Sequence, residues 1–367
     1  MRFARQTSLV TAITLLWVTS PASAFTVSSG FTRGCHEEIT WAAFQGFLLE
    51  LPVMGIPVSE DAVWRELANF LLEEGPVDPD TVDETKRFFL VSLIVGVRSP
   101  DTDGHSVTNL AQLRQLHSDP SPVGQYAHSL RGKDDDDAEG NKRAIQGIED
   151  LIADELRRSD EYLRKPPDEQ IILGSFYLDY YGRIDVDVWG PMYHLGRAAH
   201  ALQDSFAHTI RSDADNLRKI THILNYLEAI GSDFDENRDG LAHSDSMDDC
   251  SDADTEDTFN AAVEATVDLF YVARERWNAT DPNALDHLVD KWLTLKPDCT
   301  LENSFCDNAR WLKQVRKKQT GPYFKAIFGC QISEGTSSST PLWLVMGLLI
   351  VLGLFRRRQR FDPHQMR

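Results

Sequence analysis

Apolar residues recur at intervals of three and four along most of the chain, the spacing of helices with one buried face. This pattern predicts helices over residues 35–51, 60–72, 82–97, 145–163, 171–181, 192–210, 217–230, 259–277 and 285–295. No segment alternates convincingly enough to predict a hairpin. Residues 101–140 are rich in Asp, Ser, Pro and Gly, and irregular stretches of that length are usually functional or disordered. We therefore expect an all-α, multi-helix domain with one long functional loop.

The first residues have the three-part layout of a secretory signal peptide. Arg2 and Arg5 precede an apolar run over residues 9–18, and Ala22-Ser23-Ala24 supplies a small-residue cleavage pattern. Cleavage after Ala24 would remove residues 1–24 and leave Phe25 as the new N-terminus. A membrane anchor is the alternative, but the run is short for a span.

The last residues form a second removable or anchoring segment. A Ser-rich linker over residues 331–340 leads to an apolar run over 341–355 and a basic tail over 356–367. Positive charge beside an apolar run marks the cytoplasmic side of a membrane. The run predicts a transmembrane or sorting helix, either permanent or removed. Residues 25–330 are then exported as one large domain, at the cell surface or secreted.

The net charge of −20 over 367 residues limits the partners. Phosphate contacts to nucleic acid need Lys and Arg, so we expect no stable nucleic-acid complex. Adsorption of the domain to anionic membranes through charge is excluded on the same ground. A phosphate substrate remains possible, because bound divalent metals reverse the local sign of charge.

Five cysteines in an exported chain predict disulfides plus one unpaired thiol. Cys35 and Cys250 each lie close in sequence to a candidate metal ligand, described below. A disulfide between them would hold these two ligand segments together. Cys299 and Cys306 are close enough in sequence for a local loop. Cys330, just before the Ser-rich linker, would be left over.

The most informative motif is His200, Asp204 and His208, spaced at intervals of four in a strong helix-forming stretch. Each step of four rotates about 40° around a helix, so the three side chains share one face. They rise about 12 Å from end to end, too far for one ion but suitable for two neighbouring ions. His194 points about 120° away from His200 and is interpreted as structural. A helix with satisfied core histidines is the alternative.

Further candidate ligands occur elsewhere in the chain: His36, Asp101, His128, His243 and Asp248. Neutral imidazole and carboxylate are the N and O ligands that zinc uses, and a catalytic site keeps one position open. The remaining histidines have no ordered partner and are predicted not to be ligands: His105, His117, His222, His287 and His364.

These residues resemble, in their order, the zinc-dependent phospholipases C, including clostridial alpha-toxin, and the related fungal single-strand nucleases. Those proteins are all-helical and hold three zinc ions. Their ligands are the mature N-terminal residue, an early His, a loop Asp and a loop His. A His-x-x-x-Asp helix, a following His, and a later His with an acid complete the series. The matching positions here span residues 25–250: Phe25, His36, Asp101, His128, His200, Asp204, His208, His243 and Asp248.

The resemblance implies three zinc sites. Asp101, His128, His200 and Asp204 would hold the first. The amine and carbonyl of Phe25, with His36 and a bridging Asp204, would hold the second. The third and most exposed ion would take His208, His243 and Asp248.

Three features depart from the family pattern. Phe25 stands where the family commonly has Trp, and the gap between Asp204 and His208 is shorter. The last acid lies five residues after His243, not four, so Asp103, Asp245 and Asp249 are possible substitutes. The chain after residue 278 is too short for the β-sandwich that the toxin appends.

Two acidic segments have simpler interpretations. Residues 235–240 carry the Asp-x-Asn-x-Asp-Gly pattern of a calcium loop, but its twelfth position is Ser246, not Glu. We favour an acidic turn over a Ca²⁺ site. The run over residues 134–137 is expected to be solvated.

The resemblance implies a zinc-dependent hydrolase of phosphate esters, with a phospholipid as the expected substrate and two or three Zn²⁺ as cofactors. Asp101 is the expected catalytic residue, orienting or deprotonating water. The rivals are a single-strand nuclease of the same fold and a surface-displayed binding protein whose metals only hold helices together. The usual motifs of serine hydrolases, His-Glu-x-x-His proteases and P-loop proteins are missing from the sequence.

Overall fold

The computed structural model describes residues 34–46, 64, 67–68, 84–106, 109–133, 135, 139–178, 182–226, 234–243, 247–250, 254–307, 311–313 and 315. They all lie in a compact unit that covers Met1–Phe324. The predicted signal peptide, Phe25, Cys330, the linker, the apolar run over 341–355 and the basic tail lie outside the described residues. Within the described part, no helix is both long and apolar enough to cross a membrane.

The fold is mainly α-helical with two small sheets, which confirms the expected class in its coarse form. The described helices are α1 (Cys35–Gly46), α3 (Glu84–Thr102), α4 (Leu110–His117), α5 (Pro122–Ala127), α6 (Gly140–Leu163), α7 (Gly190–Ala207), α8 (Glu236–Asp239), α9 (Glu256–Asn278), α10 (Ala284–Trp292) and α11 (Ser304–Asp307). The strands are β1 (Ile171–Leu178), β2 (Gly182–Trp189), β3 (Thr209–Arg211), β4 (Lys219–Ile223) and β5 (Thr294–Leu295).

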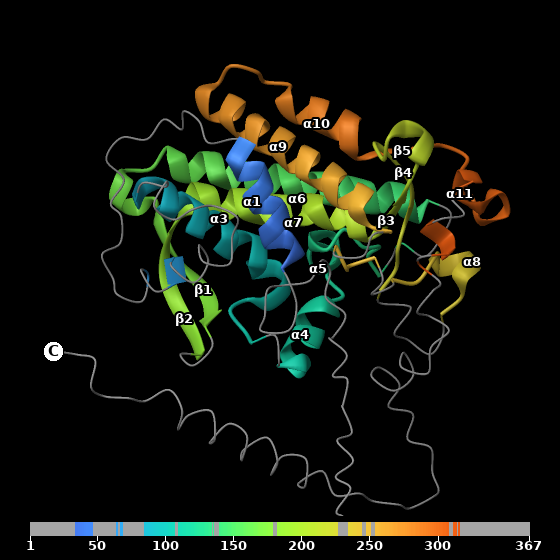
Figure 1. Ribbon diagram of the computed structural model, residues 1–367, viewed down its shortest axis with the longest axis horizontal. Coiled ribbons are helices and arrows are strands. Elements are labelled where there is room, and N and C mark those ends of the chain that lie inside the picture. The colour runs from blue at the N-terminus through green and yellow to red at the C-terminus, as the bar shows by residue number, and fades with distance from the viewer. Residues whose placement is uncertain are drawn as a thin grey trace, which may run out of the picture. The chain divides into compact units, whose positions relative to one another are not determined.

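Helix α7 is the centre of the fold and is buried along nearly its whole length. It packs against α1, α3, α6 and α9 (Figure 1). Its contact with α3 is especially close, because a Cβ at Gly96 would lie 2.1 Å from the Tyr193 carbonyl oxygen. A Cβ at Gly196 would likewise lie 2.3 Å from the Leu93 carbonyl oxygen. Glycine at both positions lets the two backbones approach, and this contact brings the last turn of α3 beside α7.

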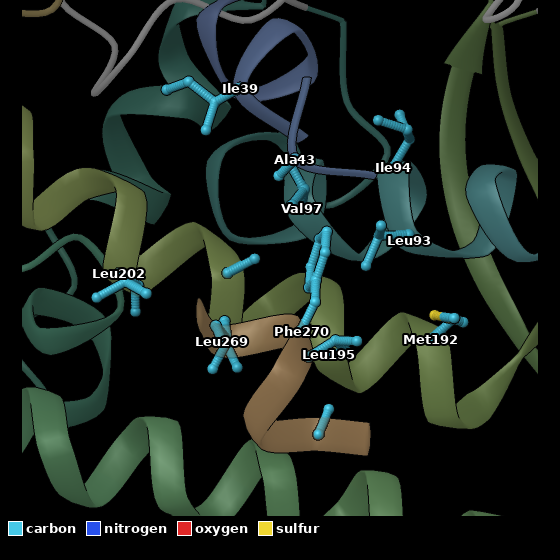
Figure 2. Packing of buried hydrophobic residues seen from close by; sticks show 14 of the residues in the cluster. Ile39, Ala43, Leu93, Ile94, Val97, Met192, Leu195, Leu202, Leu269 and Phe270 are labelled. Carbon is cyan, nitrogen blue, oxygen red and sulfur yellow. The ribbon is translucent and has the colours of Figure 1, made fainter. Parts of the chain in front are cut away.

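The hydrophobic core fills the space between these helices. Figure 2 shows Phe270 of α9 among Val97 of α3 and Leu195 of α7, with Ile39 and Ala43 of α1 nearby. Phe270 is fully buried. Truncating such a ring to Ala typically costs about 3–5 kcal/mol. The core therefore fixes the helices that carry the polar site described below.

The predicted helix over residues 171–181 is wrong, and so is the expectation of no hairpin. Residues Ile171–Leu178 form β1, which pairs antiparallel with β2 from Ile171↔Trp189 to Leu178↔Gly182. In β2, the side chains of Val186 and Val188 are buried and those of Asp185 and Asp187 are exposed, a period of two. A short apolar run such as β1 cannot be assigned to helix or strand by spacing alone. The pairing with β2 and the packing on α3 decide it.

Three other predicted helices differ from the structure: those over 192–210 and 285–295 end earlier, and the one over 217–230 contains a strand. The helix over 192–210 stops at Ala207, and β3 follows it. The region over 217–230 contains β4, which pairs antiparallel with β3 and parallel with β5 at the end of the predicted 285–295 helix. The expected irregular stretch contains α4 and α5, where Ser121 caps Gly124 N–H at 3.1 Å. A short run of apolar β-branched residues fits the spacing of a helix and the spacing of a strand. Only the pairing with another strand distinguishes the two.

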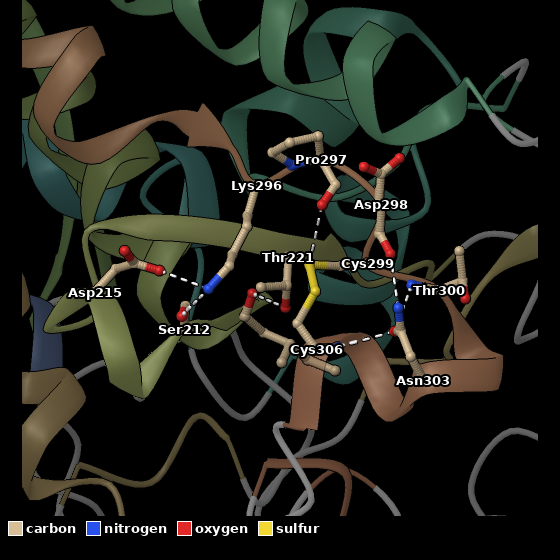
Figure 3. The surroundings of a disulfide bond; sticks show 11 residues. Ser212, Asp215, Thr221, Lys296, Pro297, Asp298, Cys299, Thr300, Asn303 and Cys306 are labelled. Atoms are coloured by element: carbon tan, nitrogen blue, oxygen red, sulfur yellow. Dashed lines mark hydrogen bonds and ion pairs between the residues drawn. A yellow bond between two sulfur atoms is a disulfide. The ribbon is translucent and has the colours of Figure 1, made fainter.

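Two disulfides confirm the predicted pairings, Cys35–Cys250 and Cys299–Cys306. The first closes a separation of 215 residues, for which the chain-entropy model gives about 5 kcal/mol of stabilisation. The second lies beside Lys296, whose Nζ is 2.9 Å from Asp215 Oδ2 and 3.0 Å from Ser212 Oγ (Figure 3). Disulfides are typical of proteins that mature in an oxidising compartment.

Candidate metal centre

The ends of several helices bring a set of His and Asp side chains together around α7. Helix α7 itself contributes His200 and Asp204, with His208 at its C-cap. The others come from the start of α1, the last turn of α3, the ends of α4 and α5, and the segment after α8: His36, Asp101, His117, His128, His243 and Asp248. All are buried, and His117 is the most exposed at 7 %.

The first group consists of His36, Asp101, His200 and Asp204. Asp204 Oδ1 lies 3.1 Å from His36 Nε2, and Asp204 Oδ2 lies 3.1 Å from His200 Nε2. Asp101 completes the group, with its carboxylate oxygens 3.7 Å from His36 Nε2 and 3.8 Å from His200 Nε2. Ligands about 2.0 Å from a tetrahedral ion lie about 3.3 Å from one another. The four side chains therefore have the spacing of a shared coordination sphere.

The second group adds His117 and His128 to Asp101. Asp101 Oδ1 is 3.2 Å from His117 Nε2 and 3.5 Å from His128 Nδ1. His128 Nδ1 also lies 3.3 Å from Asp204 Oδ2 and 3.3 Å from His200 Nε2. The two groups thus share Asp101 and touch through His128.

The third group consists of His208, His243 and Asp248. Asp248 Oδ1 is 3.3 Å from His208 Nε2, and Asp248 Oδ2 is 3.3 Å from His243 Nε2. The main chain aligns the two histidines: Leu224 N–H donates to the His208 carbonyl at 2.9 Å, and His243 N–H donates to the Asn225 carbonyl at 2.9 Å. The neighbouring disulfide ties this segment to the start of α1.

Hydrogen bonds on the far side of three imidazoles fix which nitrogen faces the carboxylates. The Nδ1 of His36 meets Gln203 Oε1 at 2.7 Å, and that amide is oriented by donating to Thr40 Oγ1 at 3.0 Å. His117 Nδ1 meets the Leu113 carbonyl at 2.8 Å, and His208 Nδ1 meets the His128 carbonyl. A carbonyl only accepts, so each Nδ1 is the donor, and the nitrogen left to bind an ion, Nε2, points towards an Asp oxygen. This is how proteins orient histidine ligands for a metal.

The carboxylates supply a second test of whether a cation fits. Asp101 Oδ2, Asp204 Oδ1 and Asp248 Oδ2 are buried and make no hydrogen bond to any described residue. Buried carboxylates without such partners are costly unless they pair with charge or coordinate metal. A divalent ion among these oxygens and the imidazole lone pairs would satisfy both. The residues present fit a metal ion, and the donor set of N and O does not by itself select the metal.

The charges of the groups are set by burial and by each other. Burial raises the pKa of Asp101, Asp204 and Asp248. The neighbouring histidines lower these pKa values by a larger amount, so each pKa falls below its usual value. Burial lowers the pKa of His128, and His117 and His200 add to this, bringing it to about 4. Ionised carboxylates and a neutral imidazole are the forms that bind metal.

The structure brings His117, which the sequence did not single out as a ligand, into one of the candidate groups. His117 stands at the end of α4, a helix that the sequence pattern did not predict, and the fold turns it towards Asp101. The other described histidines have partners away from the groups. His194 Nδ1 bonds Glu155 at 2.7 Å, His222 Nε2 accepts from Leu241 N–H at 3.0 Å, and His287 is exposed. His105 faces Arg183.

The fold also indicates which acidic residue accompanies His243 in the third group. Asp103 is half exposed and lies 3.9 Å from Arg183, and Asp249 is not among the described groups, so Asp248 fits the third group best. Asp245 and His364 lie outside the described residues. In the expected acidic turn, the Asp239 carboxylate accepts hydrogen bonds from the Arg238 side chain and from the Asp235 N–H. Asp135 is buried and paired with Arg143, contrary to the expected solvated run, and the other residues of 134–137 lie outside the described part of the chain.

Comparisons with known proteins find no matching family model, curated protein or solved structure. The resemblance to zinc-dependent phospholipases C therefore rests on the order of residues in this sequence alone.

Proposed function

We propose that this protein is an exported zinc-dependent hydrolase of phosphate esters. One observation carries the proposal: groups of four and three buried His and Asp side chains converge, and among the described residues the group of His208, His243 and Asp248 offers three protein ligands. A structural zinc site is closed by four protein ligands, whereas a catalytic site leaves a position for water or substrate. In this proposal the group of three leaves such a position, and the neighbouring group of four supplies a closed site.

In this proposal, His36, His117, His128, His200, Asp101 and Asp204 hold the inner ions, and His208, His243 and Asp248 hold the outer one. Phe25 remains a proposed inner ligand. Zinc in such sites lowers the pKa of water to about 7 and stabilises negative charge on phosphoryl oxygens.

The protein's own part is to hold these ligands and to orient water. Asp101 is ionised, because neighbouring imidazoles lower its pKa, and its Oδ2 makes no hydrogen bond to a described residue. That oxygen is placed either to hold an inner ion or to accept a hydrogen bond from the attacking water, and its lowered pKa makes it a weak proton acceptor. His117 Nε2 lies 3.2 Å from Oδ1 and would share an inner ion with that carboxylate.

The proposed substrate class is a phospholipid. The chain carries a net charge of −20, which disfavours a polyanion that makes many backbone contacts. A phospholipid presents one phosphodiester, whose charge a metal cluster can neutralise. A single-strand nuclease is the nearest alternative with the same chemistry.

The test compares the zinc-loaded protein, the chelator-treated protein and H243A on a chromogenic phosphocholine ester, phospholipid vesicles and a single-stranded oligonucleotide. We expect the loaded wild type to hydrolyse the phosphocholine substrates, and H243A to lose at least a hundredfold in rate while keeping its helical fold. H287A, which changes an exposed histidine, is the matched control.

Two results would redirect the assignment. Cleavage of the oligonucleotide alone would make the protein a nuclease. A fully loaded wild type that is inactive on every phosphoester would make the cluster a structural device, and H243A would then lower stability only.

A further inference from the structure

A buried ion pair joins the two helix ends that carry His36 and Asp101. Arg98 Nη1 of α3 lies 3.2 Å from Glu37 Oε1 of α1, and the two side chains are only 6 % and 7 % exposed. Glu37 directly follows His36, and Arg98 precedes Asp101 by one helical turn. The pair therefore spans the same junction as the 3.7 Å approach of His36 to Asp101.

The hairpin holds the cationic side of this pair. The Arg98 guanidinium carbon lies 4.5 Å from the centroid of the Phe176 ring, and Phe176 is buried in β1. An aromatic face attracts a cation, more strongly where water is excluded. Phe176 thus restricts the positions available to Arg98, and through Arg98 those available to Glu37.

Stability alone explains such a pair poorly. Two charges lose their hydration on burial, and replacing a buried pair by apolar residues is often neutral or stabilising. What a buried pair adds is a fixed geometry, since the charges of Glu37 and Arg98 meet at 3.2 Å only when α1 and α3 pack in this register. Metal ligands require this precision, because their partners set the direction of each donor atom.

We infer that the Glu37–Arg98 pair positions His36 against Asp101 and thereby tunes the affinity of the ion that these two residues share. The inference rests on the metal-binding part of the proposed function. It does not depend on which ester is hydrolysed. Glu37 and Arg98 are positioning residues, and neither is among the grouped metal ligands.

The experiment measures zinc affinity by chelator competition on the full chain, for wild type, E37Q and D160N. Asp160 is the matched control, because its buried carboxylate pairs with Arg276 and joins α6 to α9 away from the metal groups. We expect E37Q to weaken one class of zinc sites about tenfold, the lower end of the effect of losing a direct partner of a metal ligand, because Glu37 acts through the backbone that it shares with His36. The ion at His208, His243 and Asp248 should keep its affinity. D160N should lower the melting temperature without changing any zinc affinity.

Cobalt substitution gives a second readout that depends on ligand geometry. E37Q should change the visible absorption of the cobalt form, and D160N should leave it as in the wild type. E37D, which keeps the charge on a shorter side chain, should fall between wild type and E37Q in affinity.

The outcomes separate the possibilities. Wild-type zinc affinity and an unchanged cobalt spectrum in E37Q, with a melting temperature lowered as in D160N, would overturn the inference. If E37Q does not fold, E37D decides: weakened affinity supports the positioning role, and wild-type affinity overturns it. A wild type that binds no divalent ion overturns the inference together with the metal centre. A wild type that binds zinc but hydrolyses nothing overturns the proposed function alone.

Discussion

A hydrogen bond from His208 Nδ1 to the His128 carbonyl connects two of the candidate metal groups. The His128 imidazole lies beside Asp101 and Asp204, while its main-chain carbonyl accepts a hydrogen bond from His208 Nδ1. The inner groups and the third group are therefore built on one peptide unit. Ser129, at a positive φ of 49°, follows directly and bonds the Ala201 carbonyl through Oγ, which fixes that peptide on α7.

Asp204 should matter more for metal content than His194, although both lie on α7. Asp204 contacts His36, His128 and His200, so D204N should lose at least one ion per chain and most of the metal-dependent gain in melting temperature. His194 bonds Glu155 on the other side of the helix, so H194A should keep its metal while losing stability. Elemental analysis and thermal melting measure both. The opposite ranking in metal content would mean that the wrong face of α7 was assigned.

His117 should behave as a ligand, contrary to the sequence-based expectation. H117A removes the imidazole 3.2 Å from Asp101 and should weaken one ion at least tenfold in chelator competition. H105A is the control, because His105 lies between α3 and α4 and faces Arg183 instead. Equal zinc affinity in H117A and wild type would return His117 to a structural role.

Metal binding should release protons, with a defined pH dependence. Burial lowers the pKa of His36, but the Asp204 and Asp101 carboxylates and the Gln203 bond raise it more, to about 9 in the metal-free protein. Because this exceeds the unfolded value of about 6.5, the stabilisation from His36 is complete below pH 6.5 and is lost as the pH rises through 9.

The zinc-bound form has no such proton to lose. We expect the melting temperature of the metal-free protein to fall between about pH 6.5 and 9, and the gain on adding zinc to be larger at pH 8.5 than at 6.5. Calorimetry in two buffers of different ionisation enthalpy would report the released protons. A zinc affinity independent of pH across this window would contradict the assignment of His36.

Glu149 offers a test of the fold that is independent of the metals. Burial, together with Asp150 and Asp290, raises the pKa of this half-buried carboxyl to about 7. A raised carboxyl pKa favours folding while the group is protonated, so that stability is lost as the pH rises from about 4.5 through 7. E149Q should raise the melting temperature slightly at pH 8 and not at pH 4.5, whereas exposed E169Q should do neither. A gain of equal size at both pH values would point to a cause other than charge.

Much of the helical framework and of the site follows from local sequence. The interval of four that joins His200, Asp204 and His208 fixes their common direction wherever that helix lies, because helix geometry is set by neighbouring residues. The order of His36, Asp101, His128 and His243 supplied the remaining candidates. The disulfide from Cys35 to Cys250 could be predicted because both residues flank such candidates.

Only the tertiary structure decided the rest, because the deciding contacts join residues far apart in the chain. The strand over Ile171–Leu178 depends on its pairing with β2, which its own spacing does not reveal. His117 enters the site because α4 ends beside Asp101, and Asp248 is distinguished from neighbouring acids by facing both His208 and His243. Residue type and local spacing identify donors that can bind a metal; long-range packing determines which of them share an ion.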